Sequence, residues 1–315
     1  MSLRRLEPFA VPLLEISDLV VVRDPVTAER LPVRKDGVVA ELLAAGDRRG
    51  ARIAAAMPAV DGVLDPLAVD RRLVAVHTEL QRLSEELRIG DRLADLLVPL
   101  LAAVRAERAD AAPLRVVDIG CGLGYLVRRL AADGRLGADV ELVGVDLNAA
   151  LVTEAERLAR DEELPCRFVH GDAFRLPEPA TVYVSTGLLH HIRGAALEAF
   201  FAAQAGPGTA AFCHFDIAAN SLAPIGAWVF HRARMRDPLG RHDGVVSAQR
   251  AHGDAELLQA AAHAGPLVPL LYEPRGRSNP FCTTLRPVLG VRPELEAPFR
   301  AALGPRGSAR LVGAA

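Results

Sequence analysis

Three closely spaced glycines follow an aspartate in a segment that could bind a ligand. Asp118 precedes Gly120, Gly122 and Gly124, and a short apolar run comes before it. Glycines in such a turn allow backbone conformations and a close ligand approach that a Cβ atom would block. A carboxylate at Asp118 repels a diphosphate and attracts a ligand with an ammonium or sulfonium charge. The turn therefore favours a cationic ligand.

Two further acidic segments follow the next short apolar runs. Asp146 can accept hydrogen bonds from both hydroxyls of a ribose, although an acid at this place also fits a helix N-cap. Asp172 can accept a hydrogen bond from an exocyclic amine, while the N–H of Ala173 donates to a ring nitrogen and Phe174 covers a flat ring. A turn acid with a core phenylalanine is the alternative. Asp146 alone does not separate NAD from other adenosine ligands.

Histidines after later apolar runs are the candidate general bases. His190 and His191 follow one such run, and His214 lies in the next with Asp216 two residues on. Alternation along a strand places His214 and Asp216 on the same face, so these two residues can act together. Each histidine also has a structural interpretation, as a residue that shapes a loop or as a hydrogen-bonded core residue.

The segment 220–246 contains candidate acceptor-binding residues. It is longer than the usual connection of about 2–6 residues, and it includes Trp228 and His231 beside several arginines. Such a mixture suits an acceptor with a flat or apolar body and an anionic group, whereas a solvated amphipathic helix is the alternative. Tyr125, directly after the glycine-rich turn, and Asp216 complete the predicted acceptor-binding set.

Short β-rich runs alternate with helical stretches in the part of the chain that positions these residues. This alternation is typical of a parallel α/β sheet. The predicted strands cover residues 114–119, 140–145, 166–170, 181–185, 209–217, 267–272 and 280–286. The predicted helices between them cover residues 125–132, a stretch that Asn148 caps, 193–204 and 254–264.

The residues before this region are expected to form a mainly helical extension. A helix that starts at Pro66 and closes before Gly90 carries an apolar stripe, and a second helix covers 91–107. The stripe packs on its own domain or forms the seam of a homodimer. Residues 1–64 give mixed signals and carry no functional prediction.

Composition excludes several classes of protein. The chain has 315 residues, of which 50% are hydrophobic and 24% charged, and its net charge is −2. A globular chain of this length has about two domains, and its charge gives no positive field that attracts nucleic acid. No apolar run approaches the ~20 residues that cross a membrane. The start of the chain shows no signal-peptide core, so a cytoplasmic location is expected.

The basic residues and the cysteines exclude two further kinds of site. Lys35 is the single lysine, so no Gly-Lys pair of a phosphate-binding P-loop exists. The 4 cysteines lie too far apart for a zinc motif, and we expect no metal site. An arginine-rich chain of this kind is typical of a bacterial genome rich in G and C.

Four segments together resemble the class I S-adenosylmethionine-dependent methyltransferases of the small-molecule type. They are 116–124, 144–146, 171–173 and 185–192, in the order and at the spacings of that family. The resemblance covers about residues 114–217. It implies a seven-stranded, mostly parallel Rossmann-like sheet with helices on both faces and an antiparallel last strand.

The resemblance also implies a role for each matching residue. Asp118 and the loop from Gly120 to Gly124, with Cys121, would hold the methionine end of S-adenosylmethionine. Asp146 would bind the ribose, and Leu147 would pack on the adenine. The remaining contacts would come from Asp172, Ala173 and Phe174 at the adenine and from the backbone of Thr186 and Gly187 near the amino-acid end.

The sequence therefore predicts methyl transfer to a small-molecule acceptor such as a specialised metabolite, with no nucleic-acid or membrane partner. The expected domains are a helical extension at 1–108 that covers the acceptor site, a methyltransferase domain at 109–290 with 220–246 as an insertion or lid, and a tail at 291–315. One alternative is an NAD(P)-dependent oxidoreductase, which Asp146 fits but the G-x-G-x-G spacing does not. The other is a non-catalytic binding or scaffold protein that keeps the same fold.

Overall fold

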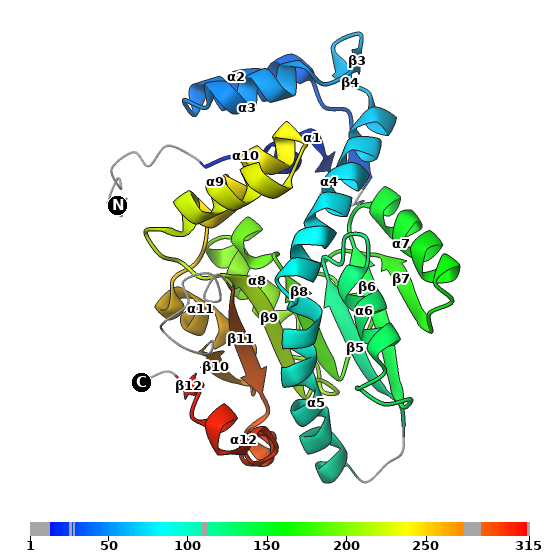
Figure 1. Cartoon of the computed structure of the whole chain (residues 1–315), viewed down its shortest axis with the longest axis vertical. Coiled ribbons are helices and arrows are strands. Elements are labelled where there is room, and N and C mark those ends of the chain that lie inside the picture. Colours follow the sequence, from blue (N-terminus) through cyan, green and yellow to red (C-terminus); the bar gives the residue numbers. More distant parts are fainter. Residues whose placement is uncertain (1–12, 25–26, 28, 109–111, 274–284, 314–315) are drawn as a thin grey trace. The chain divides into compact units, whose positions relative to one another are not determined.

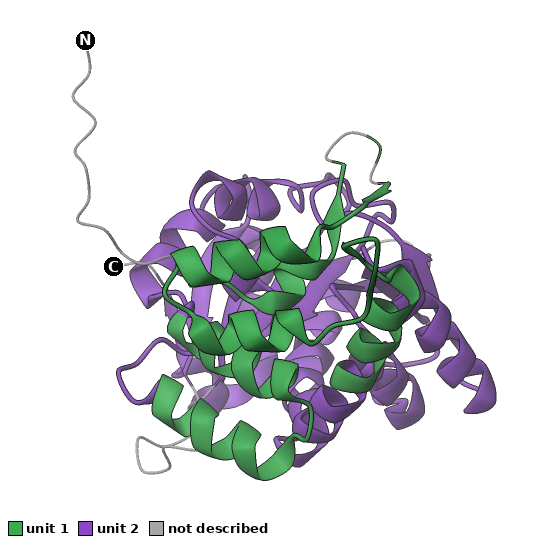
Figure 2. Cartoon of the chain, turned by 90° about the horizontal axis from the view of Figure 1, so that it is seen from above, with its two compact units in different colours: residues 1–76, 224–249 green, residues 77–223, 250–315 purple. Residues whose placement is uncertain are grey.

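The chain forms two compact units, which Figure 2 distinguishes by colour. The structure is a computed structural model that describes residues 13–24, 27, 29–108, 112–273 and 285–313. Unit 1 combines residues 1–76 with 224–249, and unit 2 combines 77–223 with 250–315. These limits differ from the expected limits at 108 and 290, because residues 77–107 group with the sheet and 224–249 group with the N-terminal residues.

One eight-stranded sheet forms the centre of unit 2 (Figure 1). Its strands are β5 (Leu114–Ile119), β6 (Val140–Asp146), β7 (Cys166–His170), β8 (Val182–Thr186), β9 (Ala211–Ile217), β10 (Val268–Tyr272), β11 (Leu285–Val291) and β12 (Leu311–Gly313). Their order across the sheet is β12-β10-β11-β9-β8-β5-β6-β7. The strands from β9 to β7 are parallel, whereas β11 is antiparallel to both of its neighbours.

The predicted mostly parallel sheet with an antiparallel last strand is confirmed. The sheet has one strand more than predicted, because β12 in the expected tail at 291–315 pairs antiparallel with the edge strand β10. Pairing satisfies backbone groups that an edge strand would otherwise leave exposed. Of the predicted strand at 280–286, residues 280–284 lie outside the described residues, and β11 begins at Leu285.

Helices cover the sheet of unit 2 on both faces (Figure 1). They are the second part of α4 (Pro66–Glu86), α5 (Ile89–Glu107), α6 (Tyr125–Asp133), α7 (Ala149–Asp161), the short 3-10 helix η1 (Leu189–His191), α8 (Ala195–Ala202), α11 (Asp254–Ala261) and α12 (Pro293–Ser308). Neighbouring residues of β5 point to opposite faces, so Val116 lies in the apolar cluster with α5 and α6, and Val117 lies in the cluster with α8 and α11. Burial on both faces explains why the strands are continuous apolar runs.

Two glycines make room for an aromatic ring in this core. A Cβ atom at Gly124 would lie 2.2 Å from Cε1 of Phe168, and one at Gly144 would lie 2.5 Å from Cδ1 of the same ring. Both distances are shorter than any real contact, so Phe168 fills space that only glycine leaves open. Gly124 therefore has a packing function that its place in the glycine-rich turn did not indicate.

Unit 1 consists of helices and two short hairpins. The helices are α1 (Ile16–Val20), α2 (Lys35–Ala44), α3 (Arg48–Ala55), the first part of α4, most of α9 (Ala223–Arg234) and α10 (Pro238–Gln249). The hairpins pair β1 (Val22–Arg23) with β2 (Arg30–Leu31), and β3 (Ala59–Val60) with β4 (Val63–Leu64).

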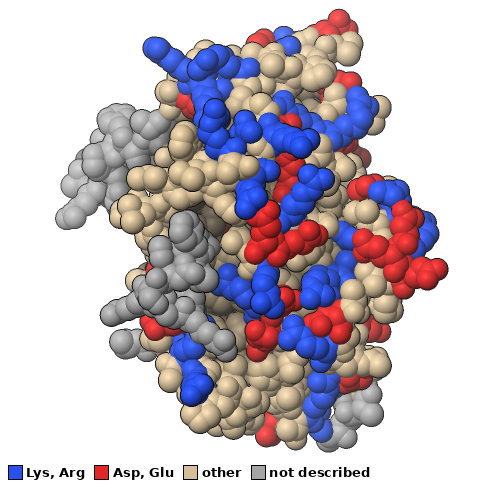
Figure 3. Space-filling view, in the orientation of Figure 1, with Lys and Arg blue, Asp and Glu red and all other residues tan. Residues whose placement is uncertain are grey.

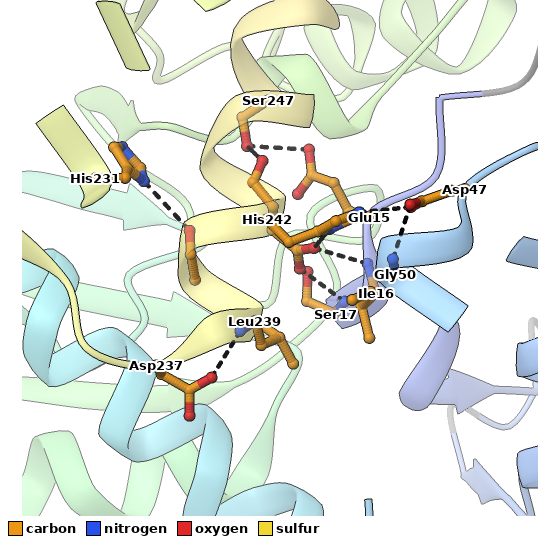
Figure 4. Close-up of polar contacts among 12 residues, drawn as sticks. Glu15, Ile16, Ser17, Asp47, Gly50, His231, Asp237, Leu239, His242 and Ser247 are labelled. Atoms are coloured by element: carbon orange, nitrogen blue, oxygen red, sulfur yellow. Dashed lines mark hydrogen bonds and ion pairs between the residues drawn. The ribbon is translucent and has the colours of Figure 1, made fainter. Parts of the chain in front are cut away.

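A buried histidine joins three segments of unit 1 (Figure 4). The Nε2 atom of His242 lies 2.5 Å from Oδ2 of Asp47, and its Nδ1 atom lies 2.7 Å from Oδ1 of Asp243. Asp243 also accepts the N–H groups of Ile16 and Ser17, at 3.0 and 2.9 Å. Because ionised carboxylates only accept hydrogen bonds, both ring nitrogens must donate, so this arrangement fits an imidazolium. The charge links α10 to the start of α1 and to the N-cap of α3.

The described surface has two further properties that concern partners. No helix among the described residues is both long and apolar enough for a bilayer. On the face shown in Figure 3, basic and acidic side chains are interspersed over α7. There Arg157 pairs with Glu154 at 2.7 Å and with Asp161 at 2.6 Å.

Candidate functional site

The glycine-rich loop between β5 and α6 is fixed to the end of β6. Gly120, Gly122 and Gly124 have φ angles of +70°, +55° and +69°, which is the left-handed region that favours glycine. The N–H groups of Gly120 and Cys121 both donate to the carbonyl of Val145, at 2.8 and 3.1 Å. These N–H groups therefore hold the loop in place. The predicted contacts between this backbone and a ligand would be made by its carbonyl groups and Cα atoms.

Asp118 at the end of β5 is buried without a matching charge. Its side chain is 2% exposed, and Oδ1 has no hydrogen-bond partner among the described residues. Burial, followed by the nearby charge of Asp146, raises the pKa of Asp118 well above its usual value. A buried polar atom without a partner is costly. A cation that donates hydrogen bonds is the ligand that would remove this cost.

Asp146 at the end of β6 is held in a defined orientation. Its Oδ2 accepts the N–H of Gly122 and its Oδ1 accepts the N–H of Asn148, both at 2.8 Å. A carboxylate has about four acceptor positions, so each oxygen keeps capacity for one more donor. The predicted bond to two ribose hydroxyls fits this capacity. Asn148 caps α7 through its side chain, which accepts the N–H of Ala150 at 3.0 Å, as predicted.

The segment after β7 combines an acid with an exposed aromatic ring. Asp172 accepts the N–H of Phe174 at 2.9 Å through Oδ1, and Ala173 between them is half-buried. Phe174 is 42% exposed and Leu147 is 40% exposed, which is unusual for large apolar side chains. Both could cover a flat ring, as the sequence predicts for adenine.

The end of β8 holds the last of the predicted cofactor residues. Thr186 is the final residue of this strand, and Gly187 follows it with a φ angle of +67°. The N–H of Gly187 donates to the carbonyl of Phe215 at 2.9 Å. This N–H therefore ties the loop to β9, and any ligand contact of Gly187 would use its carbonyl group.

His190 and Asp216 form a buried pair that the sequence analysis did not anticipate. Nδ1 of His190 lies 2.8 Å from Oδ1 of Asp216, and the backbone N–H of His190 donates to Oδ2 at 3.0 Å. Burial alone raises the pKa of Asp216, but His190 and the backbone donors outweigh it and hold the pKa below its usual value. Asp216 could have acted with His214 on the same strand, but it pairs with His190, while His214 bonds Ser185 and Gln204. His191 lies beside the pair, with 4.4 Å between the two imidazole centroids.

His214 is a core residue of unit 2. Its Nε2 lies 2.9 Å from Oε1 of Gln204, and its Nδ1 lies 2.9 Å from the hydroxyl of Ser185. Gln204 donates through its own amide to the carbonyl of Phe200 at 3.2 Å, so its oxygen faces His214 and accepts. Burial lowers the pKa of His214 to about 3. A fully buried neutral histidine with both nitrogens bonded has no access to an acceptor.

We expect His214 to make the protein sensitive to acid. Its folded pKa of about 3 lies below the unfolded value of about 6.5. Stability from this group is therefore present above pH 6.5 and is lost as the pH falls toward 3, because only the unfolded chain takes up the proton. His214→Gln should reduce the difference between the free energies of unfolding at pH 7 and pH 4 in urea titrations. An unchanged difference would contradict a neutral buried His214.

The predicted acceptor-binding residues fall into both units. Tyr125 and Asp216 lie in unit 2, where burial raises the pKa of Tyr125 and Asp216 is committed to His190. Trp228 and His231 lie on α9 in unit 1. Trp228 is 49% exposed, whereas His231 is half-buried and its Nδ1 lies 3.2 Å from the carbonyl of Gly240. These roles stay predictions.

His77 on α4 is a neighbour of the loop that the sequence analysis missed. A Cβ atom at Gly122 would lie 2.8 Å from Cδ2 and 3.5 Å from Nε2 of His77, so the imidazole lies directly on this glycine. No motif marks His77, because it is far from Gly122 in sequence and lies in an ordinary helical pattern.

The region that carries these residues matches a known family. Residues 116–206, from β5 to the loop after α8, match the family model described as a methyltransferase domain. This region is a methyltransferase domain. The result agrees with the class I resemblance of the sequence and with S-adenosylmethionine as the cofactor of the domain.

One curated relative matches part of the chain. The protein-lysine N-methyltransferase efm4 of Schizosaccharomyces pombe (strain 972 / ATCC 24843) is 35% identical over 75 residues, which are 23% of this chain and 32% of that protein. The chain thus spans about a third of the length of this relative.

Solved structures show weaker likeness. Magnesium protoporphyrin IX methyltransferase from Synechocystis PCC 6803 is 18% identical, with a TM-score of 0.44 over 82% of this chain and 96% of its own. The CMeT domain of the citrinin polyketide synthase is 16% identical, with a TM-score of 0.44 over 60% of this chain and 48% of its own. At these values the likeness supports no statement about the substrate of this chain.

The methyltransferase domain fits its cofactor at the points that the structure describes. The buried Oδ1 of Asp118 needs a donor, and the amino-acid end of S-adenosylmethionine carries an ammonium group. The oriented carboxylate of Asp146 has room for two hydroxyl donors. Exposed Leu147 and Phe174 supply apolar surface. The ends of β5, β6 and β7 therefore carry groups that are complementary to the ammonium, the ribose hydroxyls and the adenine of the cofactor.

Proposed function

We propose that this chain transfers a methyl group from S-adenosylmethionine to a small-molecule acceptor. The methyltransferase domain at 116–206 supports the reaction type. The observation that carries the proposal is the buried Oδ1 of Asp118, which lacks a partner among the described residues and stands where a cationic ligand is needed. A nicotinamide dinucleotide would bring a diphosphate toward this carboxylate, which is unfavourable.

Each part of the cofactor has a proposed partner. Asp118 and the loop carbonyls would accept the ammonium donors, and Asp146 would accept both ribose hydroxyls. Asp172 and Ala173 would pair with the adenine edge, while Leu147 and Phe174 cover its faces. The backbone around Gly120, Cys121, Gly122, Thr186 and Gly187 would line the amino-acid end.

The chemistry needs alignment more than activation. The bound cofactor supplies a methyl group on a sulfonium, whose sulfur is already a good leaving group. The chain therefore has to orient the acceptor and to exclude water from the reacting pair. A general base is needed only for an acceptor atom that must lose a proton.

His190 is the best-supported base. Its Nδ1 donates to Asp216, so Nε2 is the nitrogen that accepts a proton, and the carboxylate stabilises the imidazolium that results. His191 stays a second candidate, since its ring lies beside that of His190. His214 is excluded because it is buried and bonded on both sides.

The acceptor class and the location are proposed from the sequence and from the efm4 match. The segment 185–188 lacks the Asn/Asp-Pro-Pro-Tyr pattern of some enzymes that methylate nucleic acids and proteins. This supports a small molecule, which we propose to be a specialised metabolite of a bacterium that is methylated in the cytoplasm. The efm4 match supports protein lysine as the second candidate. A homodimer, and residues 1–108 as a cover of the acceptor site, stay predictions.

Asp118→Asn tests the cofactor assignment. Calorimetric titration of wild type with S-adenosylhomocysteine should give micromolar binding, and titration with NADH should give none. The variant should bind about 100-fold more weakly, because it loses a buried charge pair worth several kcal/mol. The free variant should be more stable than wild type at pH 7.5, since the raised pKa of Asp118 means that the folded state disfavours the charge.

The pH dependence of binding has a defined sign. An ammonium needs Asp118 ionised, so wild-type affinity should increase as the pH rises, and binding should release protons to the buffer. Asp161→Asn is the matched control, because Asp161 is an exposed partner of Arg157. NADH binding alone, or full S-adenosylhomocysteine affinity in folded Asp118→Asn, would overturn the assignment.

The acceptor is identified by transfer of labelled methyl groups. We would incubate the protein with methyl-labelled S-adenosylmethionine and either a small-molecule panel of phenols, amines and acidic carbons or a protein mixture. Label in the small-molecule fraction supports the proposal. Label in lysine side chains favours the second candidate. Cofactor binding without label in any fraction favours the non-catalytic alternative.

A further inference from the structure

His77 contacts the cofactor loop from a different part of the sequence. It is the first residue of α4 that belongs to unit 2, and its imidazole lies on Gly122. At the +55° φ angle of this glycine, a Cβ atom would meet the ring at 2.8 Å. The imidazole of His77 therefore packs against the second glycine of the loop. This part of the backbone is proposed to line the amino-acid end of the ligand.

The described ligand groups of this site are mostly acceptors. Asp118 and Asp146 are carboxylates, and the N–H groups of Gly120, Cys121 and Gly122 already donate to Val145 or Asp146. The amino-acid end of S-adenosylmethionine carries a carboxylate as well as an ammonium. A carboxylate needs donors, and two acidic side chains repel it.

Arg128 is a second basic side chain near the loop. Nε of Arg128 donates to the carbonyl of Leu123 at 3.3 Å, its Nη1 pairs with Glu162, and its Nη2 donates to Gln81 at 2.7 Å. Arg128 is 5% exposed. Arg128 thus contacts the loop through a backbone carbonyl, whereas the ring of His77 lies on a glycine of the turn.

We propose that His77 binds the carboxylate of the cofactor's amino-acid end through an imidazole N–H. This inference rests on the proposed function, since it needs S-adenosylmethionine as the ligand. His77 would be a positioning residue. A charge-assisted hydrogen bond is the strong type, and it would fix the end of the ligand that Asp118 binds through the ammonium.

The test compares two ligands that differ only in the carboxylate. S-adenosylhomocysteine and its decarboxylated form, which keeps the ammonium, thioether and adenosine, are titrated into wild type, His77→Ala and His77→Gln. We expect His77→Ala to bind S-adenosylhomocysteine about tenfold more weakly. The decarboxylated ligand should bind equally to wild type and His77→Ala. His77→Gln, which retains an N–H donor, should recover part of the loss.

Each outcome separates the inference from the function. His263→Ala is the matched control, because His263 is an exposed histidine of unit 2, and thermal unfolding confirms that each variant is folded. Equal losses for both ligands in His77→Ala, or no loss for either, would overturn the role of His77 and leave the function intact. A wild type that binds neither ligand would overturn the proposed function and this inference with it.

Discussion

His190→Asn should lower kcat about 1000-fold for an acceptor that must lose a proton, while the affinity for S-adenosylhomocysteine changes less than about twofold. A positioned general base contributes typically 10²- to 10⁴-fold to rate. Asparagine places an amide N–H near the position of Nδ1, so the bond to Asp216 can remain while the accepting nitrogen is removed. The effect should therefore fall on the proton transfer and spare the fold.

The measurement is steady-state turnover with the acceptor found by the labelling experiment, together with calorimetric titration. Asp216→Asn should also reduce kcat, because the imidazolium loses its stabilising carboxylate. His263→Asn, an exposed change in the same unit, serves as the control. A folded His190→Asn variant with wild-type kcat on a phenol would show that the His190–Asp216 pair only shapes the loop after β8.

His242→Gln should lower the free energy of unfolding of unit 1 by about 3 kcal/mol at pH 6. Removal of one partner from a buried ion pair typically costs 3–5 kcal/mol, because the remaining charge is left without compensation. Glutamine can still donate to Asp47 from the position of Nε2, but the bond to Asp243 is lost. The change thus leaves a buried carboxylate on α10 without its cation.

The pH dependence of this effect follows from the pKa of His242. Burial lowers that pKa, but the hydrogen bonds and charges of Asp243 and Asp47 outweigh burial and raise it above its usual value. The stabilisation is therefore complete below the unfolded pKa of about 6.5 and is lost as the pH rises through the folded pKa. The gap between wild type and variant should be largest at pH 6 and should shrink in alkaline solution.

Trp228 gives this experiment a local signal. It is the single tryptophan of the chain and lies in unit 1, so its fluorescence during urea titration reports on that unit. Asp47→Asn is the second variant, because asparagine preserves the N-cap of α3 but removes one of the two charges that raise the pKa of His242. As the pH rises, the stability of Asp47→Asn should begin to fall at a lower pH than the stability of wild type. A gap between wild type and His242→Gln that does not vary with pH would contradict an imidazolium.

Local patterns predicted the sheet and the places of its acidic residues along the strands, since both depend on nearby residues. Apolar runs separated by helices indicated β5 to β9, and the end of each strand placed Asp118, Asp146 and Asp172 correctly. The positions of these aspartates depend on strand alternation, glycine turns and helix caps, and each of these features involves only a few neighbouring residues. The added strand β12 was missed because three residues carry no periodic signal.

Contacts between distant segments could not be predicted in this way. Alternation correctly placed His214 and Asp216 on one face, but it could not show that the loop after β8 brings His190 to Asp216. His77 and Gly122 are likewise joined only by the packing of α4 on the loop. The network around His242 depends on Asp47, which lies in a segment without a clear periodic pattern.

The ring of Phe168 has a consequence for the evolution of the glycine-rich turn. It occupies the space that Gly124 and Gly144 leave open, and one of these glycines lies in the cofactor loop. An alanine at either glycine would need a smaller side chain at residue 168, and a smaller side chain there would leave a cavity unless a glycine changed. Related sequences should therefore show these three positions changing together. If Gly124 does not vary among them, the packing of the core would explain this as well as the binding of a ligand.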